Sequence, residues 1–422
     1  MAVERRKPIP IGEAVTKVLT HPLELQTENI QIEMALDRVL AEDIVADHPV
    51  PPFDRSPYDG FALRAEDTKT ASSKNPISLK VIEEIGAGEV ARNTIHAGQA
   101  IRIMTGAAIP QGATAVAMLE VVKELKDGTS PSIEVGRSFG EGQNIALQGE
   151  DTEKGKTLLK KGTVITPGVT ALLATFGYEN VKVYRKPRIG IYATGTELLD
   201  INEPLQPGKI RNSNAYMIAA QIRRMGGEPV YFGKLADDFE TCFEAVQSSI
   251  QDVDALVTTG GVSVGDYDYL PAIYEKLGAA TLFNKIAMRP GSVTTVAEYK
   301  GKLLFGLSGN PSACFVGGEL LVRPFIRLSM NSKPFLAKTI ASLGHDFPKP
   351  NPFTRLVRGK VEYTTDGLVA SPTGLDKSSS VTSIAEADAF IVLPGGTRGY
   401  KAGDDVEVLL FNKDSEKDPW NE

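Results

Sequence analysis

The chain has 422 residues, of which 42% are hydrophobic and 23% are charged, a balance typical of a globular protein of about three domains. Its formal net charge of −7 argues against a nucleic-acid partner, whereas a small anionic ligand needs only a local positive pocket. No run of about 18 apolar residues occurs, and the basic N-terminus is followed by Pro8 rather than by an apolar core. We therefore expect a cytoplasmic protein with no signal peptide and no membrane partner.

The cysteines and histidines do not form a metal-binding pattern. Cys242 and Cys314 are far apart within helix-like patterns, so we expect neither a disulfide nor a cysteine cluster, which fits a reducing compartment. None of the four histidines has ligand spacing, so we expect no zinc site of the Cys/His kind.

The first 180 residues show two kinds of pattern. Residues 11–45 carry apolar side chains at helical spacing, which predicts helices. Four prolines between Pro49 and Pro57 predict a stiff loop at a domain boundary. Residues 60–140 contain short apolar runs between turns, which predicts strands, and residues 141–180 return to a glycine-punctuated stretch with one helix near 169–176.

From residue 187 to residue 330, apolar strands alternate with helical patterns, which predicts a mostly parallel sheet with right-handed crossovers. After residue 331 short strands return, and a small β-barrel or sandwich fits them. We therefore expect a multidomain α/β plus β fold, with a central three-layer α/β domain, a β-rich inserted domain, an extended helical domain and a C-terminal small β-barrel. The expected boundaries are 1–49 with 141–180 for the helical domain, 50–140 for the inserted domain, 181–330 for the α/β domain and 331–422 for the barrel.

The most informative window runs from Asp254 to Tyr269, where an apolar strand leads into Gly260 and Gly261 and then into the carboxylates of Asp266 and Asp268. The two glycines permit positive backbone dihedral angles and let a ligand approach the main chain. A phosphate held by backbone N–H groups, beside a metal ion held by acids, is the chemistry that this arrangement suggests. A tight turn followed by solvated acids is the plainer alternative.

Four polar segments lie at predicted strand ends of the α/β region. In one parallel sheet these ends share an edge, so side chains far apart in sequence should converge on one crevice. Each segment also has a plainer explanation, because Glu197 suits the first turn of a helix, and Asp237, Asp238 and Asn310 could be helix caps. The segments are Thr194–Glu197, Asp237–Asp238, Gly260–Asp268 and Ser308–Asn310.

Other candidates lie outside these strand ends. Phe53–Gly60 is a proline-stiffened loop dense in polar side chains, and Arg102–Ala107 is a shorter candidate, but both could be ordinary turns. Gly149–Asp151 is a third candidate, with a simply exposed segment as the alternative. Lys285 and Arg289 precede a Pro-Gly turn and suit a phosphate or oxyanion clamp, although many such pairs are solvated surface.

With these motifs in this order, the chain resembles the molybdopterin molybdenumtransferases of the bacterial MoeA type, which are related to the E domain of gephyrin. The resemblance spans nearly the full length. It implies an elongated homodimer of four-domain subunits whose active cleft uses parts of both subunits. It also implies insertion of molybdate into adenylated molybdopterin with release of AMP, assisted by Mg²⁺, with a molybdopterin adenylyltransferase as the upstream donor. The motifs are Asp54–Gly60, Met104–Gly106, Gly149–Asp151, Thr194–Glu197, Gly260–Asp268 and Gly309–Pro311.

The resemblance further implies which residues form the site. The implied catalytic residues are Asp59, Thr105, Asp151, Glu197, Asp237 and Asp268, and the implied metal ligands are Glu197, Asp237 and Asp268. The implied substrate-binding residues are Gly260, Gly261, Ser263, Lys285, Arg289, Ser308, Asn310, Arg358 and Ser378. Three positions depart from the family pattern, because Arg289 stands where lysine is more usual, Ser292 removes one positive group, and Ser308 stands where proline is usual.

Two other functions remain open. The first is a non-catalytic scaffold of the gephyrin type. The second is a molybdopterin adenylyltransferase, which acts one step earlier and has a similar α/β unit. The glycine loop of that enzyme usually reads Gly-Gly-Thr-Gly, whereas Gly260 and Gly261 are here followed by Val262 and Ser263.

Overall fold

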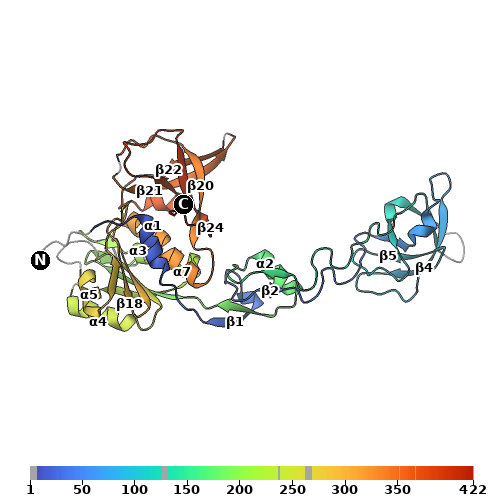
Figure 1. Cartoon of the computed structure of the whole chain (residues 1–422), viewed down its shortest axis with the longest axis horizontal. Helices are drawn as coiled ribbons and strands as arrows, with labels where there is room; N and C mark the ends of the chain where they lie inside the picture. Colours follow the sequence, from blue (N-terminus) through green and yellow to red (C-terminus); the bar gives the residue numbers. More distant parts are fainter. Residues whose placement is uncertain are drawn as a thin grey trace. The chain divides into compact units, whose positions relative to one another are not determined.

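The computed structural model describes residues 7–125, 131–235, 238–261, 269–350, 352–365 and 367–421 (Figure 1). The chain forms two compact units. The smaller unit comprises Asp43–Lys160 with Thr175–Gly177, and the larger unit comprises the remainder. Together they give a mixed α/β structure with several separate sheets.

A six-stranded sheet forms the body of the smaller unit. All six strands lie in the segment that the sequence predicts to be β-rich, and Phe61, Leu79 and Ile133 belong to its buried core. Gly60 is required where two of these strands meet, because a Cβ there would lie 2.0 Å from the carbonyl oxygen of Ala117. The strand order is β6 (Ala115–Met118), β3 (Gly60–Leu63), β5 (Gln99–Ile103), β4 (Ile77–Ile85), β8 (Ser132–Val135) and β7 (Val122–Leu125).

The larger unit contains a second six-stranded sheet, in the order β14 (Glu228–Leu235), β11 (Arg188–Thr194), β15 (Ala255–Thr259), β19 (Lys302–Leu307), β18 (Thr295–Tyr299) and β16 (Ala280–Phe283). The first four strands run parallel, as the alternation of strands and helices predicts. β18 pairs antiparallel with β19, and β16 pairs antiparallel with β18. Lys300 and Gly301, which join β18 to β19, both have positive φ, as a two-residue hairpin turn requires.

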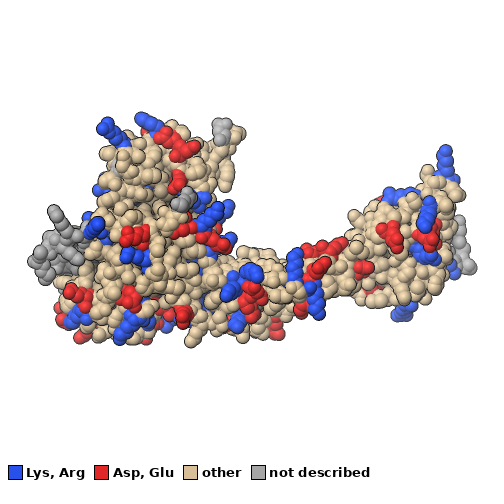
Figure 2. All heavy atoms as spheres, in the orientation of Figure 1, with Lys and Arg blue, Asp and Glu red and all other residues tan. Residues whose placement is uncertain are grey.

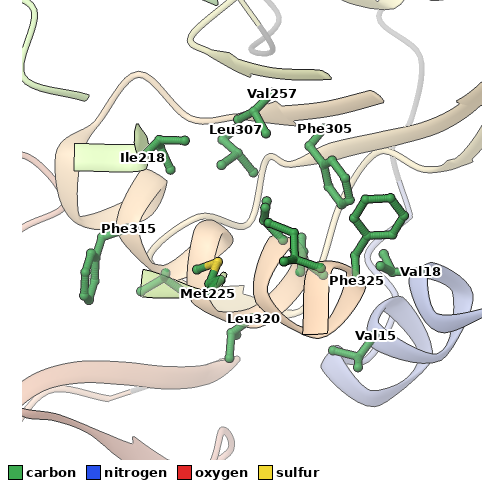
Figure 3. Close-up of a cluster of buried hydrophobic side chains, with 14 of the residues drawn as sticks. Val15, Val18, Ile218, Met225, Val257, Phe305, Leu307, Phe315, Leu320 and Phe325 are labelled. Atoms are coloured by element: carbon green, nitrogen blue, oxygen red, sulfur yellow. The ribbon is translucent and has the colours of Figure 1, made fainter. Parts of the chain in front are cut away.

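Helices cover both faces of this sheet (Figure 1). On one face, α4 (Phe239–Ser249) and α5 (Leu270–Leu277) pack on a core shared with β15 and β19. On the other face lie α1 (Ile11–Leu19), α3 (Asn214–Arg224), and a continuous helical run made of α6 (Pro311–Gly317), a π-helical turn (Gly318–Val322) and α7 (Arg323–Ser329). Figure 3 shows Val18 of α1 beside Phe325 of α7 and Phe305 of β19 in this core. The result is a three-layer arrangement.

A buried ion network fixes the helical run to its neighbours. Glu319 is fully buried and accepts hydrogen bonds from Gln221 Nε2 (2.8 Å) and Arg323 Nε (2.7 Å), and it also pairs with Arg224. Arg323 Nη1 in turn donates to Asp414 Oδ1 of β24 (Asp405–Ser415) at 2.9 Å. Burial tends to raise the pKa of Glu319, but the charges of Arg323 and Arg224 outweigh it and hold that pKa below its ordinary value.

The C-terminal strands form a ring of pairings. The order is β21 (Thr354–Thr364), β22 (Gly367–Pro372), β20 (Phe335–Leu343), β24 and β23 (Ala389–Leu393), and β23 pairs again with β21. A two-residue strand from the central segment, β17 (Met288–Arg289), adds to β21. Phe315 of α6 packs edge-on against Phe390 and Phe411 of the ring, with centroids 5.7 and 5.3 Å away, so the ring is joined to the α/β core.

The helical prediction for residues 11–45 is wrong beyond Leu19. The first helix ends there, and Pro22 follows, which suits a chain leaving a helix. Thr27–Gln31 forms β1, which pairs with β10 (Asn180–Tyr184), and a short 3₁₀ turn follows at Ile32–Met34. Apolar residues of this stretch are buried by extended pairing, as at Val39, rather than along one helical face.

Strands also interrupt the rest of the region that was expected to be helical. β2 (Ile44–Val45) pairs with β9 (Thr157–Leu159), and α2 (Pro167–Thr175) is the helix expected near 169–176. In the described part of the chain, none of the helices combines the length and the apolar character that crossing a bilayer needs.

Candidate active site

The larger unit contains a cavity of about 1590 Å³ at the carboxyl ends of its parallel strands. Three of the four strand-end segments singled out in the sequence line it, namely Thr194–Glu197, Gly260–Gly261 and Ser308–Asn310. A further wall comes from the loop 376–381, which follows β22 in the C-terminal ring. The convergence expected from parallel-strand geometry is therefore observed for these three segments, whereas Asp238, the described residue of the fourth, does not line the cavity.

Two glycines open the backbone at the end of β15. Gly260 has φ +102°, and a Cβ there would lie 2.5 Å from Thr194 Oγ1. Gly261 has φ +69°, and a Cβ there would lie 3.1 Å from the same atom. A side chain would clash at Gly260, and the positive φ disfavours one at Gly261, so both residues present bare main chain.

The neighbouring strand end is held by polar side chains. Gly260 N donates to Leu307 O at 2.8 Å, which ties the end of β15 to the end of β19. Asn214, the first residue of α3, donates through Nδ2 to Gly309 O at 2.7 Å, and Asn310 N donates to Ser308 Oγ at 3.2 Å. Ser308 and Asn310 are therefore presented to the cavity by a fixed turn.

Of the three expected metal ligands, Glu197 is the one that lies within the described residues. Its carboxylate lies over Gly195, where a Cβ would be 2.4 Å from Oε2. The residue is exposed and lines the cavity. An exposed carboxylate of this kind fits an oxygen-coordinated cation such as Mg²⁺.

Three other predicted site residues, Asp237, Ser263 and Asp268, lie outside the described residues. Their neighbour Asp238 is described and caps α4, because its Oδ1 accepts from Thr241 N at 2.9 Å and from Thr241 Oγ1 at 2.7 Å. The side-chain and backbone hydrogen bonds from Thr241 lower the pKa of Asp238. The helix-cap explanation is therefore the correct one for Asp238.

Of the two predicted clamp cations, Arg289 lines the cavity and Lys285 is not among the described lining residues. The backbone between them is not helical, and Ile286 and Met288 point into the core, so the two basic side chains do not share a helical face. β17 instead pairs in parallel with β21, which places Arg289 opposite Arg355. Sequence reasoning missed Arg355, because only the strand register brings it here.

Arg358 lines the cavity and also holds the loop 375–377 in place by hydrogen bonds. Its side chain is only 1% exposed, and its guanidinium donates to Leu375 O and Lys377 O at 3.3 and 3.4 Å and to Asp376 Oδ1 at 3.3 Å. Arg355 Nε donates to Asp376 Oδ2 at 2.8 Å. Burial lowers the pKa of Arg358, and the nearby carboxylate of Asp376 opposes that effect. Asp376, which the sequence analysis did not identify, thus anchors two arginines.

The charge balance of the cavity differs from that of the chain. On the face shown in Figure 2, acidic and basic side chains are interspersed over both units. Among the described lining residues, two acids, Glu197 and Asp376, face five basic side chains. The basic residues are Arg211, Arg289, Arg355, Arg358 and Lys377. Among the described residues, the cavity lining therefore carries more positive than negative side chains, although the formal net charge of the chain is −7.

The smaller unit carries the remaining predicted residues. Thr105 donates to Asp59 Oδ1 through its backbone N at 2.6 Å and through Oγ1 at 2.8 Å, and the backbone bond is the main reason that the pKa of Asp59 is lowered. Asp151 is exposed on another loop, where its N donates to Val50 O at 3.1 Å. The structure therefore brings Asp59 and Thr105 together, and places Asp151 beside the proline-rich loop.

Comparison with known proteins gives the family. Three family models match the chain: the MoeA N-terminal region (domain I and II) at residues 9–177, a probable molybdopterin binding domain at 190–328, and the MoeA C-terminal region (domain IV) at 341–411. The chain is 56% identical over 421 residues to a Bacillus subtilis protein named molybdopterin molybdenumtransferase, covering 99% of this chain and 98% of that protein. The chain belongs to the MoeA family.

Other members support the same assignment. A Staphylococcus aureus molybdopterin molybdenumtransferase is 47% identical, with 98% of each chain covered. The crystal structure of a MoeA molybdopterin biosynthesis protein from Pyrococcus horikoshii matches the fold with a TM-score of 0.82 at 33% identity, covering 96% of this chain and all of that one. The MoeA resemblance drawn from the sequence motifs is confirmed.

Proposed function

We propose that this chain is a molybdopterin molybdenumtransferase, which inserts molybdenum into adenylated molybdopterin and releases AMP. The observation that carries the proposal is the cavity, where open glycine backbone and a surplus of arginines meet at one edge of the sheet. Relatives with that name are 47% and 56% identical to nearly the whole chain.

The cavity suits a reaction between two anions. Molybdate is a dianion and adenylated molybdopterin carries a pyrophosphate, and two unit charges 4 Å apart repel by about 4 kcal/mol at an effective dielectric constant near 20. Arg289, Arg355 and Arg358 offset this repulsion. The N–H group of Gly261 and the side chains of Ser308, Asn310 and Ser378 would supply hydrogen bonds to the oxyanions.

The acids have a different role in this proposal. Glu197, together with Asp237 and Asp268, would hold Mg²⁺ on the pyrophosphate, and the ion would stabilise the charge on the leaving AMP. The exposed carboxylate of Glu197 on the cavity wall supports this role. Lys285 would contribute positive charge near the cavity rather than direct contact.

Asp59, Thr105 and Asp151 would complete the cleft in a homodimer, from the smaller unit of a partner subunit. Their surface supports this, because the loops that carry them also expose the apolar side chains of Phe53 (46%) and Leu147 (53%). Exposed apolar side chains beside functional acids are typical of a surface that a partner covers. The four domain boundaries, the cytoplasmic location and supply of the substrate by a molybdopterin adenylyltransferase stay predictions.

The test is release of AMP from adenylated molybdopterin by the purified protein, with and without molybdate. Molybdate-dependent release is expected. No release would favour a non-catalytic scaffold of the gephyrin type. Adenylation of molybdopterin on incubation with ATP would instead identify a molybdopterin adenylyltransferase.

A further inference from the structure

Two walls of the cavity come from different parts of the fold. One wall is the turn Ser308–Asn310, which joins β19 to α6 of the α/β layer. The other is the loop 376–381 of the C-terminal ring, which contains Ser378. An oxyanion that contacts both walls needs a fixed spacing between them, because misplacement by about 1 Å costs a factor of about 10² in rate.

Ser312 links these two walls. It is the second residue of α6, and its backbone N donates to Ser378 O at 2.9 Å while its Oγ donates to Ser380 O at 2.8 Å. N–H groups in the first turn of a helix have no acceptor inside the helix, so this one is available to the loop. One residue therefore ties the start of α6 to the middle of the loop.

Ser312 does not itself reach a ligand. Its exposure is 0%, and it is absent from the described residues that line the cavity, whereas its neighbours Asn310, Pro311 and Ala313 are present there. The start of the loop is held separately, by the pairing of Asp376 with Arg355 and Arg358. The two hydrogen bonds of Ser312 join the loop at Ser378 and Ser380 to the α/β layer.

We propose that Ser312 is a positioning residue that sets the distance between the Ser308–Asn310 turn and the Ser378 loop, and thereby the affinity of the site for molybdate. The inference rests on the proposed function for the identity of the oxyanion. It predicts that loss of the Ser312 hydroxyl lowers the affinity for molybdate, whereas loss of a comparable buried hydroxyl elsewhere lowers only the stability.

The experiment compares Ser312→Ala with Ser329→Ala. Ser329 is a matched control, because it is also buried in the same helical run, and its Oγ donates to Phe325 O at 2.7 Å and accepts from Leu23 N at 2.9 Å, away from the cavity. For each protein, the Kd for molybdate alone is measured by calorimetry, the KM for molybdate by AMP release, and the Tm by thermal unfolding.

Ser312→Ala is expected to raise the Kd and the KM for molybdate about tenfold, whereas Ser329→Ala leaves both within about twofold of the wild type, at a similar loss of Tm. Equal molybdate affinities in the two folded variants would overturn the inference. If Ser312→Ala does not fold, Ser312→Cys, which keeps a weak donor, should weaken molybdate binding in the same direction, and an unchanged Kd there would also overturn it.

The binding measurement separates this inference from the proposed function. A wild type that binds molybdate but releases no AMP would contradict the proposed reaction, while the ratio of Kd values would still decide the role of Ser312. A wild type that does not bind molybdate would overturn both.

Discussion

Gly260→Ala tests whether the end of β15 needs a bare backbone. At φ +102° an alanine is strained by about 1–3 kcal/mol. Its Cβ would also lie 2.5 Å from Thr194 Oγ1 and 2.9 Å from Thr194 O, and relieving such overpacking costs about 1–3 kcal/mol more. We expect a loss of unfolding free energy of about 2–6 kcal/mol, the sum of these two costs.

Gly278→Ala is the matched control. Gly278 also has positive φ, +74°, at the end of α5, but a Cβ there would meet nothing within 4 Å. Its substitution should therefore cost only the backbone strain, about 1–2 kcal/mol.

Urea unfolding followed by tryptophan fluorescence suits the comparison, because Trp420 is the one tryptophan of the chain and packs against the core of the larger unit. AMP release should fall at least about tenfold for Gly260→Ala, because the new methyl group obstructs the approach of the substrate to the main chain. It should be unchanged for Gly278→Ala. If the two variants lost the same unfolding free energy and had the same activity, the close contact between position 260 and Thr194 would have no effect, and the prediction would be wrong.

Three further predictions concern buried or acidic groups. Glu319→Gln should cost about 3–5 kcal/mol near neutral pH by breaking a buried ion network. Because the pKa of Glu319 is lowered in the folded state, this stabilisation is present above pH 4.5 and is lost as the pH falls below it, so urea unfolding of wild type and variant should converge in acid. Asp376→Asn should cost about 3 kcal/mol, since it leaves the buried Arg358 without its carboxylate, and a midpoint of thermal unfolding equal to that of the wild type would contradict the pairing. Asp268→Asn should lower turnover about 10²–10³-fold with the fold intact, and AMP release within about threefold of the wild type would remove Asp268 from the catalytic set.

Much of the candidate site could be predicted from the sequence, because it depends on a rule that links local pattern to overall geometry. Strands that alternate with helices form a parallel sheet, and the carboxyl ends of parallel strands meet at one edge. Thr194 ends such a strand, and Gly260 and Ser308 follow two others, so their convergence could be predicted without knowledge of side-chain packing.

The features that sequence reasoning missed depend on register and on distant contacts. Arg355 reaches the site because β17 and β21 pair in one particular register, and Asp376 becomes important because two arginines meet it. Periodicity also misled at residues 27–40, where pairing with β10 and with neighbouring loops overrides an apolar spacing that resembles a helix. In this wall of the cavity, the family resemblance implied Arg358 and Ser378 but not Arg355 and Asp376.

The pairing of β17 with β21 affects where two relatives can be joined to make a chimeric protein. Arg289 belongs to the central segment of the chain, yet the strand with which it pairs, β21, belongs to the C-terminal ring, with Met288 opposite Thr354. A hybrid in which one relative donates everything after Phe335 to another would exchange the scaffold beneath this arginine while leaving the arginine itself in place. Crossover points for chimeric proteins are therefore better chosen so that both strands come from the same parent.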